Sequence, residues 1–254
     1  MRRAAAIAAI AAVAAVVAAA AIVLVTRGDD GDAAHQRFVV GTGTRAAVVM
    51  RPHDPGPGRP VVLFLHGWTA NVPRAYGAWL RHLVDQGADV VFPIYQRPPF
   101  DDVRTPLPNV LAAVRAALAR LPGHGPVIAA GHSAGGSLSS DYAASAASSG
   151  LPRPVAVYAV YPGRDLGPGR FLRGPPPTRI AAGTRLLVLE SPTDRVVGTA
   201  TAQSIVAGAT RVRGELRTIQ DPVLGEHNAP TGDSERVRTT FWTPLDRVIR
   251  AASG

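Results

Sequence analysis

A serine lies between two glycines in the sequence GHSAGG, where Gly131, Ser133 and Gly135 have the spacing G-x-S-x-G. The apolar stretch PVIAAG leads into this motif, and a stretch of small residues follows it. At a tight turn from a strand to a helix, flanking glycines avoid the clashes of Cβ atoms and the serine hydroxyl is held above the sheet. The pattern therefore predicts that Ser133 is a nucleophile.

A serine hydroxyl needs a general base, and the base needs a carboxylate that orients it. With the nucleophile at a strand-to-helix turn, the order along the chain is nucleophile, acid, histidine. Of the seven histidines only His227 follows Ser133, and it lies in LGEHNAP after the last predicted strand. His227 is therefore the predicted base.

The acid is expected just beyond the end of a strand, between the serine and the histidine. Asp194 in SPTDRVV is the preferred candidate, and Asp165 in YPGRDLG, after the preceding strand, is the alternative. Asp221 and Asp233 lie closer to His227 in the sequence and are interpreted as solvated loop charges.

The negative charge that develops on the carbonyl oxygen during acyl transfer is stabilised by backbone N–H groups, here expected from two different loops. The segment FLHGWTAN follows the first central strand, so the N–H of Trp68 or Gly67 is expected to act with the N–H of Ala134. Tyr95 and Tyr161 follow two other strands at the same edge of the sheet, where ligands bind. They are candidate substrate-binding residues with Gly67, and a role in the core or at the rim is the alternative for both.

Segments typical of strands and helices alternate along the chain. The strands are predicted at 37–40, 45–50, 61–67, 88–95, 126–131, 154–161, 185–191 and 214–220, and the helices at 74–87, 106–121, 134–148, 197–207 and 236–251. Continuous apolar runs such as VVLFLHG suit parallel strands buried on both faces. The sequence predicts an α/β fold with a mostly parallel central sheet and helices on both faces.

With these elements in place, the chain resembles the α/β-hydrolase superfamily over roughly residues 37–252. The matching pieces are LHGW, GHSAGG, SPTD and EHN. The resemblance implies a triad of Ser133, Asp194 and His227, with Trp68 and Ala134 as the oxyanion hole. It also implies hydrolysis of a lipid or small acyl ester through an acyl-enzyme, as in serine esterases and lipases, without a metal or organic cofactor.

Two features depart from branches of that superfamily. The oxyanion loop has HGW instead of the HGGG of one branch of lipases and esterases, so that branch is not assigned. About two dozen residues separate the strands at 154–161 and 185–191, too few for a large helical cap. The site is therefore expected to be open, with residues 167–177 as a short flap.

Other activities fit the same residues. Amide or thioester hydrolysis on the same fold is one alternative, and a non-catalytic, envelope-associated binding scaffold is another. A complete set of serine, histidine and acid argues against the scaffold, which would not need all three.

An apolar segment precedes the predicted domain. Residues 4–25 carry no charge, and a helix of that length spans roughly 33 Å, enough to cross a membrane. Arg2 and Arg3 before it favour a cytoplasmic N-terminus, which places the catalytic domain outside. The predicted organisation is an anchor or signal at 1–27, a linker at 28–36 and a hydrolase domain at 37–254. A cleaved signal and secretion is the alternative to a single-pass membrane protein, because the alanine-rich segment offers many small-residue cleavage sites.

The charge and composition of the chain exclude several classes of binding partner and site. The net charge of +9 comes from arginine alone, and the arginines are scattered without interleaved aromatic residues, so no nucleic-acid partner is expected. The absence of cysteine excludes a thiol nucleophile and a disulfide framework. The histidines lack the spacing of metal ligands, and no metal site is predicted.

Overall fold

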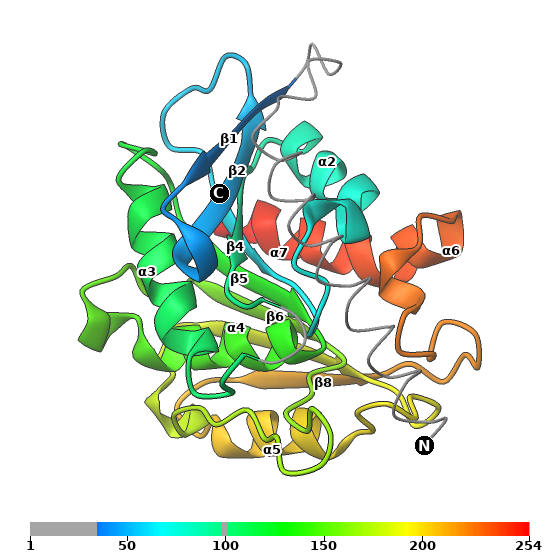
Figure 1. Cartoon of the computed structure of the whole chain (residues 1–254). Helices are drawn as coiled ribbons and strands as arrows, with labels where there is room; N and C mark the ends of the chain where they lie inside the picture. Colours follow the sequence, from blue (N-terminus) through cyan, green and yellow to red (C-terminus); the bar gives the residue numbers. More distant parts are fainter. Residues whose placement is uncertain (1–34, 98–100, 254) are drawn as a thin grey trace, which may run out of the picture.

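The computed structural model describes residues 35–97 and 101–253, which are organised around one eight-stranded sheet (Figure 1). Its strand order is β1-β2-β4-β3-β5-β6-β7-β8. β1 and β2 are antiparallel to their neighbours, and the pairs from β4 through β8 are parallel, so the predicted α/β fold with a mostly parallel sheet is confirmed. The strands are β1 (His35–Val40), β2 (Ala46–Pro52), β3 (Val61–Leu65), β4 (Asp89–Ile94), β5 (Val127–His132), β6 (Ala156–Val160), β7 (Arg185–Glu190) and β8 (Gly214–Thr218).

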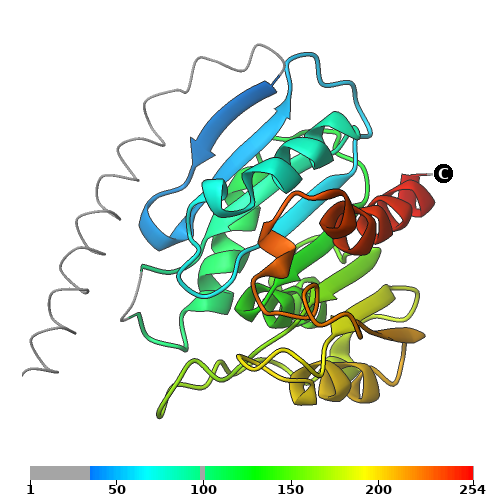
Figure 2. The ribbon, with the colours of Figure 1, turned by 90° about the vertical axis from the view of Figure 1, so that its right-hand side faces the viewer.

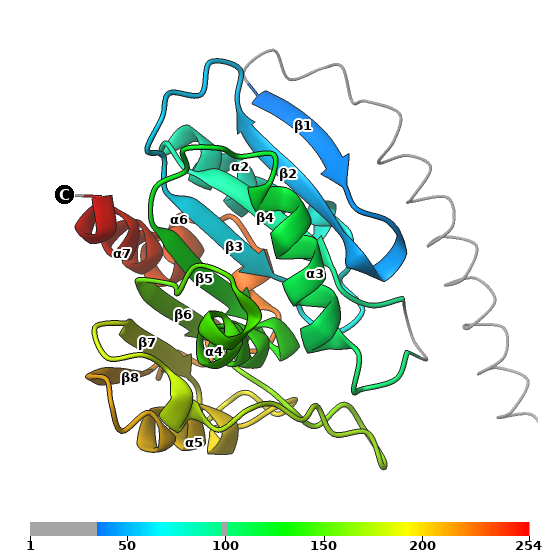
Figure 3. The same cartoon turned by 90° about the vertical axis from the view of Figure 1, so that its left-hand side faces the viewer.

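Helices cover both faces of this sheet. The first core contains buried residues of α3, α4 and α5, and the second contains buried residues of α2 and α7. Figure 2 shows α2 and α7 in front of the sheet, and Figure 3 shows α3 and α4 in front of the opposite face. The helices are α2 (Gly77–Asp85), α3 (Pro106–Leu118), α4 (Ala134–Ser145), α5 (Ala200–Gly208), α6 (Glu235–Val237) and α7 (Thr243–Ser253).

The apolar runs of the sequence supply both cores at once. Along β3, Leu63 and Leu65 belong to the first core while Val62 and Phe64 belong to the second. Successive side chains of a strand point to opposite faces, so a strand between two helical layers must be apolar throughout. This explains why VVLFL shows no alternation between apolar and polar residues.

The predicted final helix at 236–251 is divided in the structure. It consists of α6, a π-helical segment at Arg238–Trp242 and α7. The other predicted elements are present within a few residues, with short 3₁₀ turns next to several of them. β1 begins at His35, inside the segment predicted as a linker.

The predicted anchor or signal at residues 1–27 lies outside the described residues. Within the described ranges, no helix is both long enough and apolar enough to cross a membrane.

Two glycines allow the turn between β5 and α4 to pack against β3. A Cβ atom on Gly135 would lie 2.0 Å from the carbonyl oxygen of Leu65, and one on Gly131 would lie 2.3 Å from the carbonyl oxygen of Gly135. Neither backbone oxygen can move away easily, because the Leu65 oxygen belongs to β3 in the sheet and the Gly135 oxygen to the first turn of α4. The two glycines of G-x-S-x-G are thus required by close backbone packing at the carboxyl end of the central strands.

Candidate active site

Ser133 lies at the junction of β5 and α4 in a strained backbone conformation. Its φ and ψ are 58° and −126°, and it is one of three non-glycine residues with positive φ among residues 35–97 and 101–253. Hydrogen bonds hold it there: its N–H donates to Val160 at 3.0 Å, and its carbonyl accepts from Gly136 at 2.9 Å and Gly163 at 3.1 Å. Such strain persists where the surroundings over-determine it, typically at functional sites.

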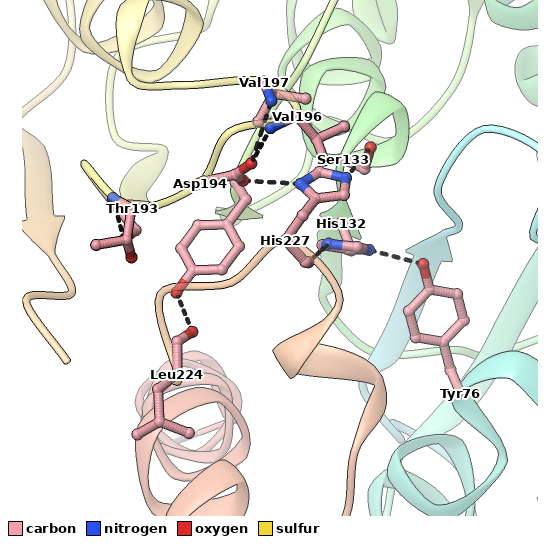
Figure 4. Close-up of polar contacts among 11 residues, drawn as sticks. Tyr76, His132, Ser133, Thr193, Asp194, Val196, Val197, Leu224 and His227 are labelled. Atoms are coloured by element: carbon pink, nitrogen blue, oxygen red, sulfur yellow. Dashed lines mark hydrogen bonds and ion pairs between the residues drawn. The ribbon is translucent and has the colours of Figure 1, made fainter. Parts of the chain in front are cut away.

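Two loops at the carboxyl edge of the sheet bring His227 and Asp194 to this serine (Figure 4). Ser133 Oγ lies 2.9 Å from His227 Nε2, and Asp194 Oδ2 lies 2.7 Å from His227 Nδ1. Because a carboxylate only accepts hydrogen bonds, Nδ1 carries the proton and the lone pair of Nε2 faces the serine hydroxyl. The arrangement can therefore remove a proton from Ser133.

The Asp194 carboxylate is held by the turn that contains it. Its side chain is fully buried, and Oδ1 accepts hydrogen bonds from the N–H groups of Val196 at 2.8 Å and Val197 at 3.1 Å. Burial alone would raise the pKa of Asp194, but the hydrogen bond and charge of His227, with these two N–H groups, hold the pKa below its usual value. The acid therefore stays ionised beside the imidazole.

The alternative acid lies elsewhere. Asp165 is exposed, and its carboxylate accepts a hydrogen bond from the N–H of Gly167 instead of contacting His227. Asp221 accepts hydrogen bonds from Val223 and Leu224 within its own turn, and Asp233 is exposed.

The oxyanion loop differs in one detail from the expectation that Gly67 or Trp68 donates. The Gly67 N–H donates to the Tyr76 hydroxyl at 3.0 Å, so the Gly67 alternative is wrong. The Trp68 N–H remains the candidate oxyanion donor from this loop. None of the hydrogen bonds in the described part of the chain uses the N–H of Trp68 or the N–H of Ala134. A Cβ on Gly67 would lie 3.3 Å from the Cβ of Ser133, which places this loop directly beside the nucleophile.

The prediction that Tyr95 and Tyr161 contact substrate is wrong, and the alternative role in the core applies. Both are fully buried, and neither lines the cleft at Ser133. The Tyr95 ring stacks on His66 at 4.0 Å and its hydroxyl donates to the His66 carbonyl. The Tyr161 hydroxyl donates to the carbonyl of Leu224 at 2.7 Å, in the loop that carries His227. Strand-end position alone does not distinguish such supporting residues from residues that face a ligand.

An open cleft of about 610 Å³ lies over Ser133. Its wall includes Leu166, Val196, Val197, Asn228 and Thr231, which the sequence motifs do not mark as site residues, although each lies close in sequence to Asp165, Asp194 or His227. No large helical cap covers the cleft in the described residues, and the predicted flap contributes only its first residue, Gly167. The lining residues are Gly67, Trp68, Thr69, Ala70, Tyr76, His132, Ser133, Gly163, Asp165, Leu166, Gly167, Val196, Val197, His227, Asn228 and Thr231.

The described residues do not form a recognisable set of metal ligands. In residues 35–97 and 101–253, no group of three or more histidine, aspartate or glutamate side chains is placed to hold a metal ion.

Two buried histidines next to the site make stability depend on pH. Burial lowers the pKa of His66 to about 4, and burial with the neighbouring charge of His227 lowers that of His132 to about 3. Between pH 6.5 and about 4 the unfolded chain binds protons that the folded chain does not, so stability falls on acidification by up to about 1.4 kcal/mol per pH unit for each histidine. We expect the free energy of unfolding to be about 2–4 kcal/mol lower at pH 5 than at pH 7.

Urea unfolding followed by tryptophan fluorescence at pH 7, 6 and 5 measures this dependence. The variant His132→Gln should retain only the part of the slope that His66 contributes. A free energy of unfolding that stays constant from pH 7 to pH 5 would contradict the prediction.

Comparison with known proteins agrees with the fold. A family profile described as the alpha/beta hydrolase fold matches residues 62–186, a range that contains β3 through the start of β7 and the serine turn. The chain has the α/β-hydrolase fold. No curated protein sequence matches the chain.

Solved α/β-hydrolase structures resemble the chain over most of its length. An esterase from the bacterial hormone-sensitive lipase family has 19% identity and a TM-score of 0.66, covering 88% of this chain and 86% of its own. Carboxyl esterase 2 from the fungus Tuber melanosporum has 21% identity and a TM-score of 0.63, with coverages of 89% and 88%. Esterase B from Lactobacillus rhamnosis, solved with a tributyrin phosphonate, has 17% identity and a TM-score of 0.65, with coverages of 87% and 86%. At these identities the likeness concerns the α/β-hydrolase fold.

Proposed function

We propose that this protein hydrolyses carboxylic esters with Ser133 as nucleophile, His227 as general base and Asp194 as the orienting acid. The observation that carries the proposal is the continuous chain from Ser133 Oγ to His227 at 2.9 Å and from His227 to Asp194 at 2.7 Å. The α/β-hydrolase fold places such a chain at the carboxyl edge of the sheet, as here.

Acylation begins when Ser133 Oγ attacks the ester carbonyl carbon while its proton passes to His227 Nε2. The tetrahedral oxyanion is stabilised by the N–H groups of Trp68 and Ala134, whose hydrogen atoms are not used within the described protein. The imidazolium then returns the proton to the leaving alkoxide. The alcohol departs, and the acyl group remains bound to Ser133.

Deacylation reverses these roles with water as the nucleophile. His227 takes a proton from water as the water oxygen attacks the acyl carbon, and then gives it to Ser133 Oγ as the carboxylic acid leaves. Asp194 keeps Nδ1 protonated in both halves and stabilises the imidazolium.

The cleft indicates a small-molecule or lipid acyl ester as substrate. Its wall combines apolar groups from Val196 and Leu166 with polar groups from Asn228 and Thr231. Val196 is 67% exposed, so an apolar side chain stands at the open mouth of the cleft. Several similar structures carry the name esterase, and one of them was solved with a phosphonate of tributyrin, a short-chain ester.

Amide and thioester hydrolysis are second candidates, because the same nucleophile, base and oxyanion donors serve all three acyl transfers. A non-catalytic scaffold is disfavoured by the strained serine, since strain at a residue without a function has no compensating role.

A fluorophosphonate probe tests the proposal on the full chain. We expect labelling of the wild type at Ser133, located by peptide mass spectrometry, and no labelling of His227→Ala, whose serine lacks its base. Labelled protein should lose hydrolysis of p-nitrophenyl esters. Turnover of matched anilides and thioesters, measured on the unlabelled protein, then distinguishes ester hydrolysis from amide and thioester hydrolysis. A well-folded wild type that neither labels nor hydrolyses any of these would refute the proposal.

Location at or outside the membrane is a separate proposal that rests on the sequence of residues 4–25 alone. The mass of the mature protein distinguishes an uncleaved anchor from a removed signal.

A further inference from the structure

A buried series of hydrogen bonds runs from the oxyanion loop to the loop of His227, and Figure 4 shows its part from Tyr76 through His132 to His227. The Gly67 N–H lies 3.0 Å from the Tyr76 hydroxyl, and this hydroxyl lies 2.9 Å from His132 Nδ1. At the other end, His132 Nε2 lies 2.8 Å from the backbone carbonyl of His227. This last contact joins two residues 95 positions apart in the sequence, and His132 directly precedes the nucleophile.

The two ends of this series determine its direction. A backbone N–H only donates and a backbone carbonyl only accepts, so Gly67 donates at one end and His227 accepts at the other. His132 must therefore carry its proton on Nε2, and its Nδ1 must accept the proton of the Tyr76 hydroxyl. Every member then donates and accepts without conflict, and His132 is neutral.

The surroundings agree with a neutral His132. Its side chain and that of Tyr76 are almost completely buried, at 3% and 2% exposure. The His132 ring lies 4.9 Å from the His227 ring, so a charge on His132 would oppose the imidazolium that forms on His227 during acyl transfer. The buried tyrosine also keeps its proton, since burial raises its pKa above the ordinary value.

Each end of the series acts on a group that the proposed reaction needs. With its N–H bound by Tyr76 and its carbonyl bound by His66 at 2.7 Å and Ala70 at 3.0 Å, Gly67 is held on both sides, and Trp68 follows it directly. The carbonyl of His227 belongs to the base itself. Among the described hydrogen bonds, His132 is the residue that binds this carbonyl.

We propose that Tyr76 and His132 are positioning residues that hold the oxyanion donor of Trp68 and the base His227 at a fixed separation on either side of Ser133. This role rests on the proposed acyl-transfer function. Neither residue touches the reacting atoms through its polar group. Their effect is on the alignment of the two loops, to which catalysis is sensitive at the level of an ångström.

The variant Tyr76→Phe removes one hydroxyl and leaves the Gly67 N–H and His132 Nδ1 without their partner. Tyr158→Phe is the matched control, because Tyr158 is also fully buried and its hydroxyl donates to a backbone carbonyl, that of Phe241 at 2.8 Å, away from the cleft. Tyr76→Phe loses two buried hydrogen bonds and Tyr158→Phe loses one, so both variants are expected to unfold at a lower temperature.

Turnover is then measured per active site, with the concentration of active sites taken from fluorophosphonate titration of the full chain. Tyr76→Phe is expected to lower kcat by about 10- to 100-fold with KM changed by less than about threefold, while Tyr158→Phe keeps kcat within about twofold of the wild type. Equal kcat values for the two variants would overturn the proposal, because the loss would then be one of stability alone.

A second pair of variants tests the histidine. Glutamine can accept from Tyr76 through its oxygen and donate to the His227 carbonyl through its nitrogen, whereas leucine can do neither. His132→Gln is expected to recover at least about tenfold in kcat per active site over His132→Leu. Equal kcat in the two variants would count against a positioning role.

Nitrogen NMR of the full chain with ¹⁵N-labelled histidine gives a readout that does not require activity. We expect one histidine, identified by its loss in His132→Gln, to carry its proton on Nε2 at neutral pH and to change its Nδ1 shift in Tyr76→Phe. A proton on Nδ1 of His132, or no change of its Nδ1 shift in Tyr76→Phe, would show that the inferred series of hydrogen bonds is wrong. Absence of phosphonate labelling in the wild type would instead refute the proposed function, with the NMR result unaffected.

Discussion

Replacing Ser133 by alanine is expected to lower kcat for ester hydrolysis by about 10⁴- to 10⁶-fold, the range seen when the nucleophile of such a triad is removed. The hydroxyl oxygen is the atom that forms the acyl-enzyme, and no other hydroxyl lies against His227 Nε2 among the described hydrogen bonds. The measurement is p-nitrophenyl ester turnover with fluorophosphonate labelling of the same preparations.

Ser139→Ala is the matched control for this substitution. Ser139 lies in the same helix, α4, and its buried hydroxyl donates to the carbonyl of Gly136 at 2.7 Å without contacting the cleft. We expect this control to label and to turn over ester as the wild type does. Activity of Ser133→Ala within about tenfold of the wild type would exclude Ser133 as the nucleophile.

Replacing Asp194 by asparagine is expected to lower kcat by about 10⁴-fold at neutral pH, by changing the tautomer of His227. The amide oxygen of asparagine can still accept from Val196 and Val197, which leaves the NH₂ group facing His227 Nδ1. Nδ1 must then accept, the proton moves to Nε2, and Nε2 can no longer take the serine proton. Because the turn keeps its two backbone hydrogen bonds, the fold should be retained.

Steady-state kinetics with thermal unfolding of each variant measure this effect. Asp233→Asn is the control for a change of one charge, since Asp233 is exposed and near His227 in sequence. Asp165→Asn tests the alternative acid and should change kcat by less than about tenfold. If Asp165→Asn caused the larger loss, the assignment of Asp194 would be incorrect.

Much of the fold could be predicted because its signals are local. Apolar runs such as VVLFL in β3 reflect burial on both faces of a strand, and their alternation with amphipathic segments indicates a parallel sheet between helices. The division of the last helix at Arg238–Trp242 was missed, since a π-helical segment has no strong local signature in the sequence.

The nucleophile candidate was also a local feature. A Cβ atom on Gly131 would clash with the oxygen of Gly135, and a Cβ atom on Gly135 would clash with the oxygen of Leu65. Both positions therefore require glycine, and these residue types reveal the turn. The choice between Asp194 and Asp165 was not local, because both follow strand ends. The tertiary structure brings only Asp194 to His227, at 2.7 Å, in a turn whose N–H groups orient the carboxylate.

The sequence by itself determined the α/β architecture, the serine turn and His227 as the base candidate, since each depends on residue type and on spacing within a few positions. Only the tertiary structure decided that Tyr95 and Tyr161 are buried supports, that the Gly67 N–H is occupied, and that Tyr76 and His132 join the two loops. Those outcomes depend on hydrogen bonds between residues up to 95 positions apart. The partner of a buried polar group is selected by the three-dimensional packing of strands and loops, and no local pattern of residue types specifies it.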